Sequence, residues 1–122
     1  MRTPTYTILY VDSPEASARL YARLLDAQPV EASPTFQLFA LENGRILGLW
    51  AKAGVEPAAD FHGSGSELAF RVDSEAEVDA LHAQWKEHGL RILQKPVAMD
   101  FGYTFAGADP DGHRVRVFSR SE

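Results

Sequence analysis

The side chains that could ligate a metal or act as nucleophiles are few and scattered. The chain of 122 residues has no cysteine, which removes thiol nucleophiles, iron–sulfur clusters and Cys-ligated zinc. His82 and His88 are six residues apart in an expected helix, off the four-residue spacing that would place them side by side. His113 falls in an expected turn, and His62 falls in a linker that could fold over a pocket and bring this imidazole to a ligand. We expect structural or solvent-exposed roles for the other three histidines.

Aromatic side chains suit a different chemistry, the stacking of a planar ligand. Trp50 ends an expected strand and could stack on such a ligand, although core packing or a dimer interface would use the same side chain. Asp100 could accept a hydrogen bond from a ligand, or it could be a solvated loop carboxylate. Large side chains alternate before the last expected turn, and we expect them on one side of that segment: Met99, Phe101, Tyr103 and Phe105, with Phe36 as the counterpart in the first half. Some of these must belong to the core.

The composition and the absence of other motifs exclude several functions. Twelve Lys and Arg against 17 Asp and Glu give a net charge of −5 without a basic run, which argues against a nucleic acid or an anionic membrane as partner. No stretch approaches the roughly 18 apolar residues of a membrane span, and no apolar signal core opens the chain. Neither a Gly-rich phosphate loop nor a zinc-protease helix motif occurs. We therefore expect a soluble cytoplasmic protein of one domain, residues 1–122.

An internal repeat organises this domain. The tripeptide Val-Asp-Ser at residues 11–13 recurs at residues 72–74, and Leu20 and Ala22 recur at the same offset as Leu81 and Ala83. Each copy begins with a strand, at about 6–11 and 67–72, which runs into a serine that can cap a helix. Pro14 stands at the first helical position of one copy, and Ser-Glu-Ala-Glu at residues 74–77 forms a capping box in the other. One structural unit is therefore repeated.

Three further strands are expected after each helix. In the first half, Asn-Gly at residues 43–44 separates the strands 36–41 and 45–50, the strongest short hairpin signal. In the second half, Asp-Pro-Asp-Gly at 109–112 separates the strands 103–106 and 114–118. The sequence thus predicts an α+β fold of two βαβββ modules, at about 5–51 and 67–119, joined by a linker at 52–66.

Strand alternation assigns the faces of these sheets. If Leu9 and Val11 pack under the first helix, then Tyr6, Ile8 and Tyr10 lie on the opposite face, and the repeat places Glu67, Ala69 and Arg71 likewise. In the last strand, Val115 and Val117 would be buried and Arg116 would face away from the helix. So many aromatic groups on faces open to water predict curved mixed sheets around a cavity, with the helices on the outer face.

These modules resemble the vicinal oxygen chelate superfamily, which includes glyoxalase I, extradiol dioxygenases and the bleomycin resistance proteins. The resemblance rests on ILYVDS at residues 8–13, its echo at 68–74 and DPDGH at 109–113, and it covers essentially the whole chain. Gly-Leu-Trp at 48–50 and the segment 95–105 are most similar to antibiotic-binding resistance proteins of the phenazine type.

The resemblance implies where a metal would bind. Metal-dependent members place His and Glu ligands at positions that correspond here to Tyr6, Gly48, Glu67 and Arg116. Of these, only Glu67 is a good ligand for a divalent ion, and a working site needs three or more. We therefore expect no metal and no cofactor, and we expect Glu67 and Arg116 to form a salt bridge, direct or through water, at the vacated position.

Two functions remain in view. The first is metal-independent binding and sequestration of a planar, mainly apolar small molecule by a homodimer with a cavity near its interface; the expected ligand contacts are Trp50, Tyr6, Phe36, Gly48, Glu67, Arg116, Asp100, Phe101, Tyr103 and His62. The alternative is a lyase, isomerase or dioxygenase of the same superfamily, with Glu67 as general base near Tyr6. Arg116 would make that carboxylate a poorer base, so we lean towards binding without catalysis. An interaction module without a small ligand is disfavoured by the aromatic face.

Overall fold

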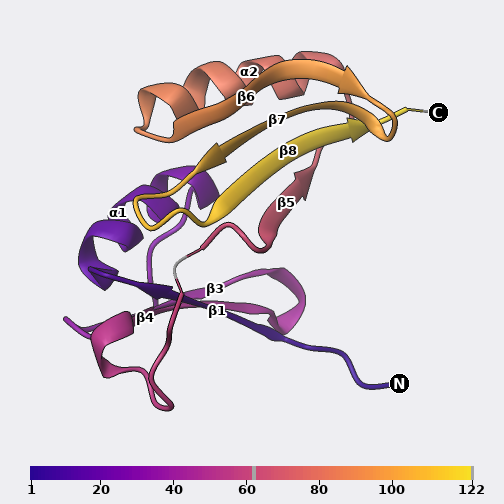
Figure 1. Ribbon diagram of the computed structural model, residues 1–122. Helices are drawn as coiled ribbons and strands as arrows, with labels where there is room; N and C mark the ends of the chain where they lie inside the picture. The colour runs from indigo at the N-terminus through magenta and orange to yellow at the C-terminus, as the bar shows by residue number, and fades with distance from the viewer. Residues whose placement is uncertain (62, 122) are drawn as a thin grey trace. The chain divides into compact units, whose positions relative to one another are not determined.

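The computed structural model describes residues 1–61 and 63–121, which fall into two compact units, Met1–His62 and Gly63–Glu122 (Figure 1). Each unit contains one α-helix and one four-stranded mixed sheet, so that the α+β class and the repeated βαβββ order predicted from the sequence are confirmed. Neither helix of the described residues is long and apolar enough to cross a membrane. The predicted ligand contact His62 lies outside the described residues.

In the first unit, the first and last strands pair in parallel at one end of the sheet. The order of the sheet is β1-β4-β3-β2, with β1 and β4 parallel and the other pairs antiparallel. The elements are β1 (Tyr6–Val11), α1 (Pro14–Leu25), β2 (Glu31–Ala32), β3 (Phe36–Ala40) and β4 (Ile46–Ala51), with 3₁₀ turns η1 (Glu42–Gly44) and η2 (Lys52–Gly54). The predicted hairpin is β3–β4, and Asn43 and Gly44 in its loop take the positive φ values of 60° and 73° that this turn requires.

The second unit repeats this topology, and its last three strands are longer than those of the first unit. Its sheet has the order β5-β8-β7-β6, with β5 and β8 parallel. The elements are β5 (Glu67–Arg71), α2 (Glu75–Glu87), β6 (Arg91–Met99), β7 (Gly102–Ala108) and β8 (Arg114–Arg120). Two register shifts interrupt the pairing of β6 with β7, on either side of Gln94.

Both helices begin as their sequences dictate. The Ser13 hydroxyl accepts a hydrogen bond from the Ala16 amide at 3.1 Å, and Pro14 takes the first helical position. The Ser74 hydroxyl accepts from the Glu77 amide at 3.2 Å, while the Glu77 carboxylate accepts from the amide of Asp73, one residue before the cap. One of the orphan amides at each helix start is thereby partnered by a side chain, which helps to fix where each helix begins.

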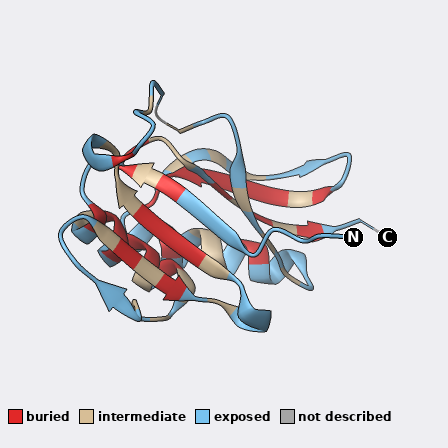
Figure 2. Ribbon diagram, turned by 90° about the horizontal axis from the view of Figure 1, so that it is seen from below, coloured by how far each residue is buried: buried red, intermediate tan, exposed pale blue. Residues whose placement is uncertain are grey.

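Each helix covers one face of its own sheet, and the core lies between them. Figure 2 shows buried and more exposed positions following one another along the strands. In the first unit, β1, β3 and β4 bury Leu9, Val11, Phe39, Leu47 and Leu49 with Leu20, Tyr21 and Leu24 of α1. In the second unit, β7 and β8 bury Phe105, Val115 and Val117 with Val78 and Trp85 of α2. We call the other face of each sheet, turned away from its helix, the open face.

Candidate functional site

Arg116 lies on the open face of the second sheet and is held by three other strands. Its Nε donates to Glu67 Oε1 of β5 at 2.7 Å. Its Nη1 donates to Gln94 Oε1 of β6 at 2.9 Å and to Thr104 Oγ1 of β7 at 3.1 Å. The Thr104 hydroxyl in turn donates to the carbonyl of Val117 at 2.8 Å. The predicted salt bridge between Glu67 and Arg116 is therefore confirmed as a direct contact.

This ion pair is only partly shielded from water. The Arg116 side chain is 16% exposed and that of Glu67 is 35% exposed. A pair at this depth keeps some hydration, so its contribution to stability lies between that of a surface pair and that of a fully buried one. Its clearest effect is geometric, since three hydrogen bonds fix the guanidinium plane on the open face.

An aromatic pair lies beside the guanidinium. The rings of Phe101 and Phe118 have centroids 5.9 Å apart and meet edge to face at 79°. The Arg116 Cζ atom lies 5.9 Å from the centroid of Phe101, within the range of a cation–π contact. Phe101 is 41% exposed and Met99 is 46% exposed. This end of the open face therefore offers an apolar, partly solvated surface next to a fixed positive group.

The expectation that Met99, Phe101, Tyr103 and Phe105 lie on one side is wrong. The Tyr103 hydroxyl donates to Asp79 Oδ1 of α2 at 2.8 Å, and Phe105 packs edge to face on Trp85 with centroids 6.0 Å apart. Both side chains therefore lie on the helix side of the sheet. The reason is the turn at residues 100–101, which separates β6 from β7 and breaks the alternation.

Tyr103 therefore participates in a contact with the helix. The pKa of its phenol is raised above the usual 10.0 because its hydroxyl donates a hydrogen bond to Asp79, and burial and the negative charges of Asp79 and Glu75 add to this effect. Asp100, by contrast, is an exposed residue of the β6–β7 turn, directly before Phe101 in the chain.

The first unit has an aromatic open face of its own. Tyr6 and Ile8 are 58% and 42% exposed there. Tyr10 and Trp50 lie on adjacent strands with ring centroids 6.1 Å apart at 82°. A Cβ atom added at Gly48 would lie 2.9 Å from the ring of Phe36. The Phe36 ring therefore occupies space that a side chain at position 48 would need. Tyr6, Phe36, Gly48 and Trp50 thus belong to one surface.

Two hollows of the first unit lie on its surface. One of about 390 Å³ runs beside α1 and contains none of the predicted site residues; it is lined by Glu15, Ala18, Arg19, Ala22, Arg23, Gln28, Pro29 and Gln37. The other, of about 380 Å³, is lined by Phe36 together with Glu31, Ala32 and Ser33 at the β2 edge. Polar side chains dominate the first of them, so it does not suit the planar apolar ligand expected from the sequence.

Three residues around Arg116 were not among the ligand contacts predicted from the sequence: Gln94, Thr104 and Phe118. Thr104 and Phe118 share a face with Arg116 through strand alternation, and this signal was sufficient to find them. Gln94 gave no such signal, because the register shifts on both sides of it remove the period of two.

The residues at the metal position do not fit a metal ion. The Glu67 carboxylate accepts a hydrogen bond from the Arg116 guanidinium, and a permanently charged guanidinium cannot ligate a cation. Within residues 1–61 and 63–121, no three His, Asp or Glu side chains gather as a set of ligands.

The protein consists of two βαβββ units, in each of which the helix covers one face of the sheet and leaves the other face open. This repeated unit defines the class to which the protein belongs. The chain matches the model of the Glyoxalase/Bleomycin resistance protein/Dioxygenase superfamily over residues 3–117, and it belongs to that family. It is 30% identical to the phenazine antibiotic resistance protein EhpR of Enterobacter agglomerans, with 94% of this chain and 90% of that protein covered.

Solved structures show the same fold. A protein of Agrobacterium tumefaciens, whose structure was determined in solution by NMR, is 54% identical over the whole of both chains, with a TM-score of 0.91. A glyoxalase-related enzyme from Fulvimarina pelagi is 26% identical, with 98% of this chain and 89% of that chain covered and a TM-score of 0.87. Proteins described as a resistance protein and as an enzyme therefore share this fold, and function has to be argued from the site.

Proposed function

We propose that this chain is a cytoplasmic, metal-independent binding protein that sequesters a planar, mainly apolar small molecule. The observation that carries the proposal is the Phe101–Phe118 pair beside Arg116, whose guanidinium is fixed by hydrogen bonds to three strands. A flat apolar molecule gains affinity from aromatic contacts, and a few fixed polar groups set its orientation. The similarity to the phenazine antibiotic resistance protein of Enterobacter agglomerans supports a ligand of this shape.

The enzyme alternative is less well supported by the geometry. A general base needs a carboxylate that is free to accept a proton from the substrate. The Oε1 atom of Glu67 instead accepts a hydrogen bond from Arg116 at 2.7 Å. We therefore propose binding, with a lyase, isomerase or dioxygenase activity as the second candidate.

Titration with phenazine tests this function. The purified protein is expected to bind phenazine with a change in the fluorescence of its two tryptophans. Phe101→Ala is expected to weaken binding about tenfold, because it removes half of the aromatic pair on the open face. Phe61→Ala is the matched control, since this ring is 81% exposed and lies outside both sheets. The proposal fails if neither phenazine nor larger planar heterocycles bind, or if turnover of such a compound is found.

We also propose that the chain forms a two-fold homodimer. Exposed apolar side chains on and beside the open faces support this assembly; they are Tyr6, Ile8, Val97, Met99 and Phe101. Light scattering at micromolar concentration is expected to give twice the chain mass of 13.5 kDa. A mass of one chain under these conditions would contradict the assembly while leaving the ligand proposal standing.

A further inference from the structure

The open face of the second sheet carries a concentration of arginine in an otherwise acidic chain. Arg114, Arg116 and Arg120 alternate along β8, and Arg71 ends the parallel neighbour β5. Glu67 is the one acidic residue of these two strands. The chain as a whole has a net charge of −5, so the positive charge of this face is local and opposite in sign to the net charge of the protein.

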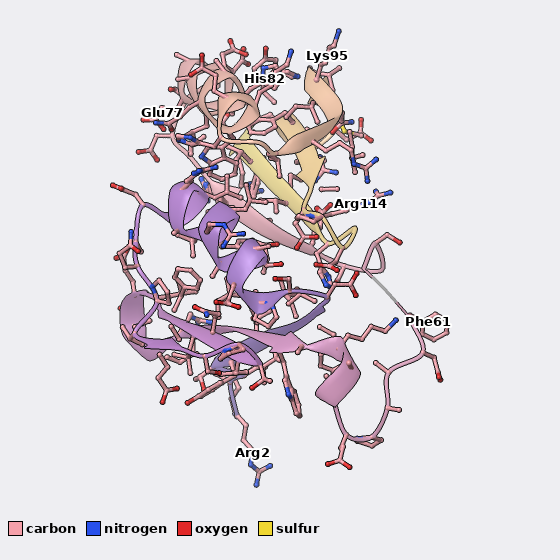
Figure 3. All side chains as sticks on the ribbon, turned by 90° about the vertical axis from the view of Figure 1, so that its left-hand side faces the viewer. Arg2, Phe61, Glu77, His82, Lys95 and Arg114 are labelled. Carbon is pink, nitrogen blue, oxygen red and sulfur yellow. The ribbon has the colours of Figure 1, made fainter. Side chains whose placement is uncertain are left out.

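Two of these arginines have no partner among the described residues. The Glu67 carboxylate lies in register with Arg114 on the adjacent strand, yet it pairs with Arg116. The side chains of Arg114 and Arg120 are exposed and form neither a hydrogen bond nor an ion pair within residues 1–61 and 63–121. Figure 3 labels Arg114 at the start of β8. The face therefore holds more positive charge than its own carboxylate balances.

The guanidinium of Arg116 also keeps one nitrogen unused. Its Nε and Nη1 atoms make the three hydrogen bonds described above, and Nη2 makes none with the described residues. Arg114 stands two residues earlier on the same face, about 7 Å away along the strand. An anionic group could therefore accept hydrogen bonds from Nη2 of Arg116 and from Arg114 together, and guanidinium groups suit planar carboxylates.

We propose that the ligand is a planar aromatic acid, whose ring lies against Phe101 and Phe118 and whose carboxylate is bound by Arg116 and Arg114. This inference rests on the proposed function and names the chemical class of its ligand. Along β8, Arg114 stands two residues before Arg116, and Phe118 of the aromatic pair stands two residues after it, so one molecule with a carboxylate and a ring meets both. Positive charge on this face also attracts an anion that the acidic chain would otherwise repel.

A matched pair of compounds tests the ligand class. Phenazine-1-carboxylate and phenazine-1-carboxamide have the same ring and nearly the same size and differ in charge at pH 7. Calorimetric titration of the wild-type protein at low salt is expected to show the carboxylate binding about tenfold tighter or more, because each hydrogen bond to a charged group gains strength. Rising salt is expected to reduce this preference.

Three variants assign the preference to this face. Arg114→Gln and Arg116→Gln are each expected to remove most of the preference for the carboxylate. Lys86→Gln, the same change of charge on α2 on the other side of the sheet, is expected to keep it. Because the Arg114 side chain is exposed and has no partner in the described part of the chain, its variant remains informative even if Arg116→Gln fails to fold.

The outcomes distinguish a failure of the aromatic-acid ligand from a failure of the proposed binding function. Equal affinities of the wild-type protein for both compounds would overturn the aromatic acid and leave the binding function intact. A preference that both arginine variants retain would also overturn it. If neither compound binds while phenazine or a larger planar heterocycle does, the aromatic acid is overturned and the binding function stands; if none of them binds, the proposed function fails and this inference with it.

Discussion

Replacing Gly102 with alanine is expected to lower the free energy of unfolding by about 2–6 kcal/mol, because two costs add. Gly102 has φ of +147°, a conformation that L side chains rarely adopt. The added Cβ would also overlap the carbonyl oxygen of Ser119 and lie 2.9 Å from the Cα of Arg120 on β8. Relief of that overlap has to move β7 against β8, next to the turn that holds Phe101.

Gly112→Ala is the matched control for this change. Gly112 also has a positive φ, of 83°, but a Cβ there meets nothing within 4 Å. Only the conformational cost remains, and we expect a loss of about 1 kcal/mol. Denaturant unfolding followed by tryptophan fluorescence measures both, since Trp85 is buried in the same unit. Equal losses for the two variants would show that β7 and β8 are not as close at Gly102 as described.

Arg116→Ala is expected to cost about 1–3 kcal/mol of stability, because it removes three hydrogen bonds from a charged donor. The loss stays below that of a fully buried pair, since the abandoned Glu67 carboxylate is 35% exposed and can be hydrated. Glu67→Gln is expected to cost less, because the amide oxygen still accepts from Arg116. The double variant should lose less than the sum, by about 0.5–1 kcal/mol.

Arg114→Ala serves as the control on the same strand. Its side chain is exposed and has no partner among the described residues, so its removal is expected to change stability by no more than about 0.5 kcal/mol. Thermal and denaturant unfolding of the wild type, Arg116→Ala, Glu67→Gln and the double variant, with Arg114→Ala as control, gives the coupling energy between Arg116 and Glu67 directly. Strict additivity would mean that the ion pair makes no contribution and that Glu67 is again available as a general base.

Much of the fold and part of the site follow from local sequence signals. The Val-Asp-Ser repeat, the caps at Ser13 and Ser74 and the Asn-Gly hairpin each report on a few neighbouring residues, and all of them predict elements that the structure contains. The Glu67–Arg116 pair was predictable for a different reason. The resemblance identified both positions as ligands of one ion, which requires their side chains to converge.

The rest of the site depends on interruptions of regular structure. The turn at residues 100–101 puts Phe101 beside Arg116 and turns Tyr103 to α2, although simple alternation would place both on one face. The register shifts in β6 bring Gln94 to Arg116. A bulge or turn of this kind is fixed by the pairing of β6 with β7, which a short sequence window does not contain.

The pairing of the first strand of each unit with the last has a consequence for how the chain folds during its synthesis. β1 pairs with β4 and β5 pairs with β8, and among the described residues no strand of one sheet pairs with a strand of the other. The backbone ladder of the first unit can therefore be complete once residue 51 has left the ribosome, before β5 emerges. The first strand of each unit needs only the last strand of the same unit as its partner. The loop between two paired strands therefore never spans more than about half of the chain. Two short searches replace one long search, which shortens the time during which the apolar faces of a nascent chain are exposed to other molecules.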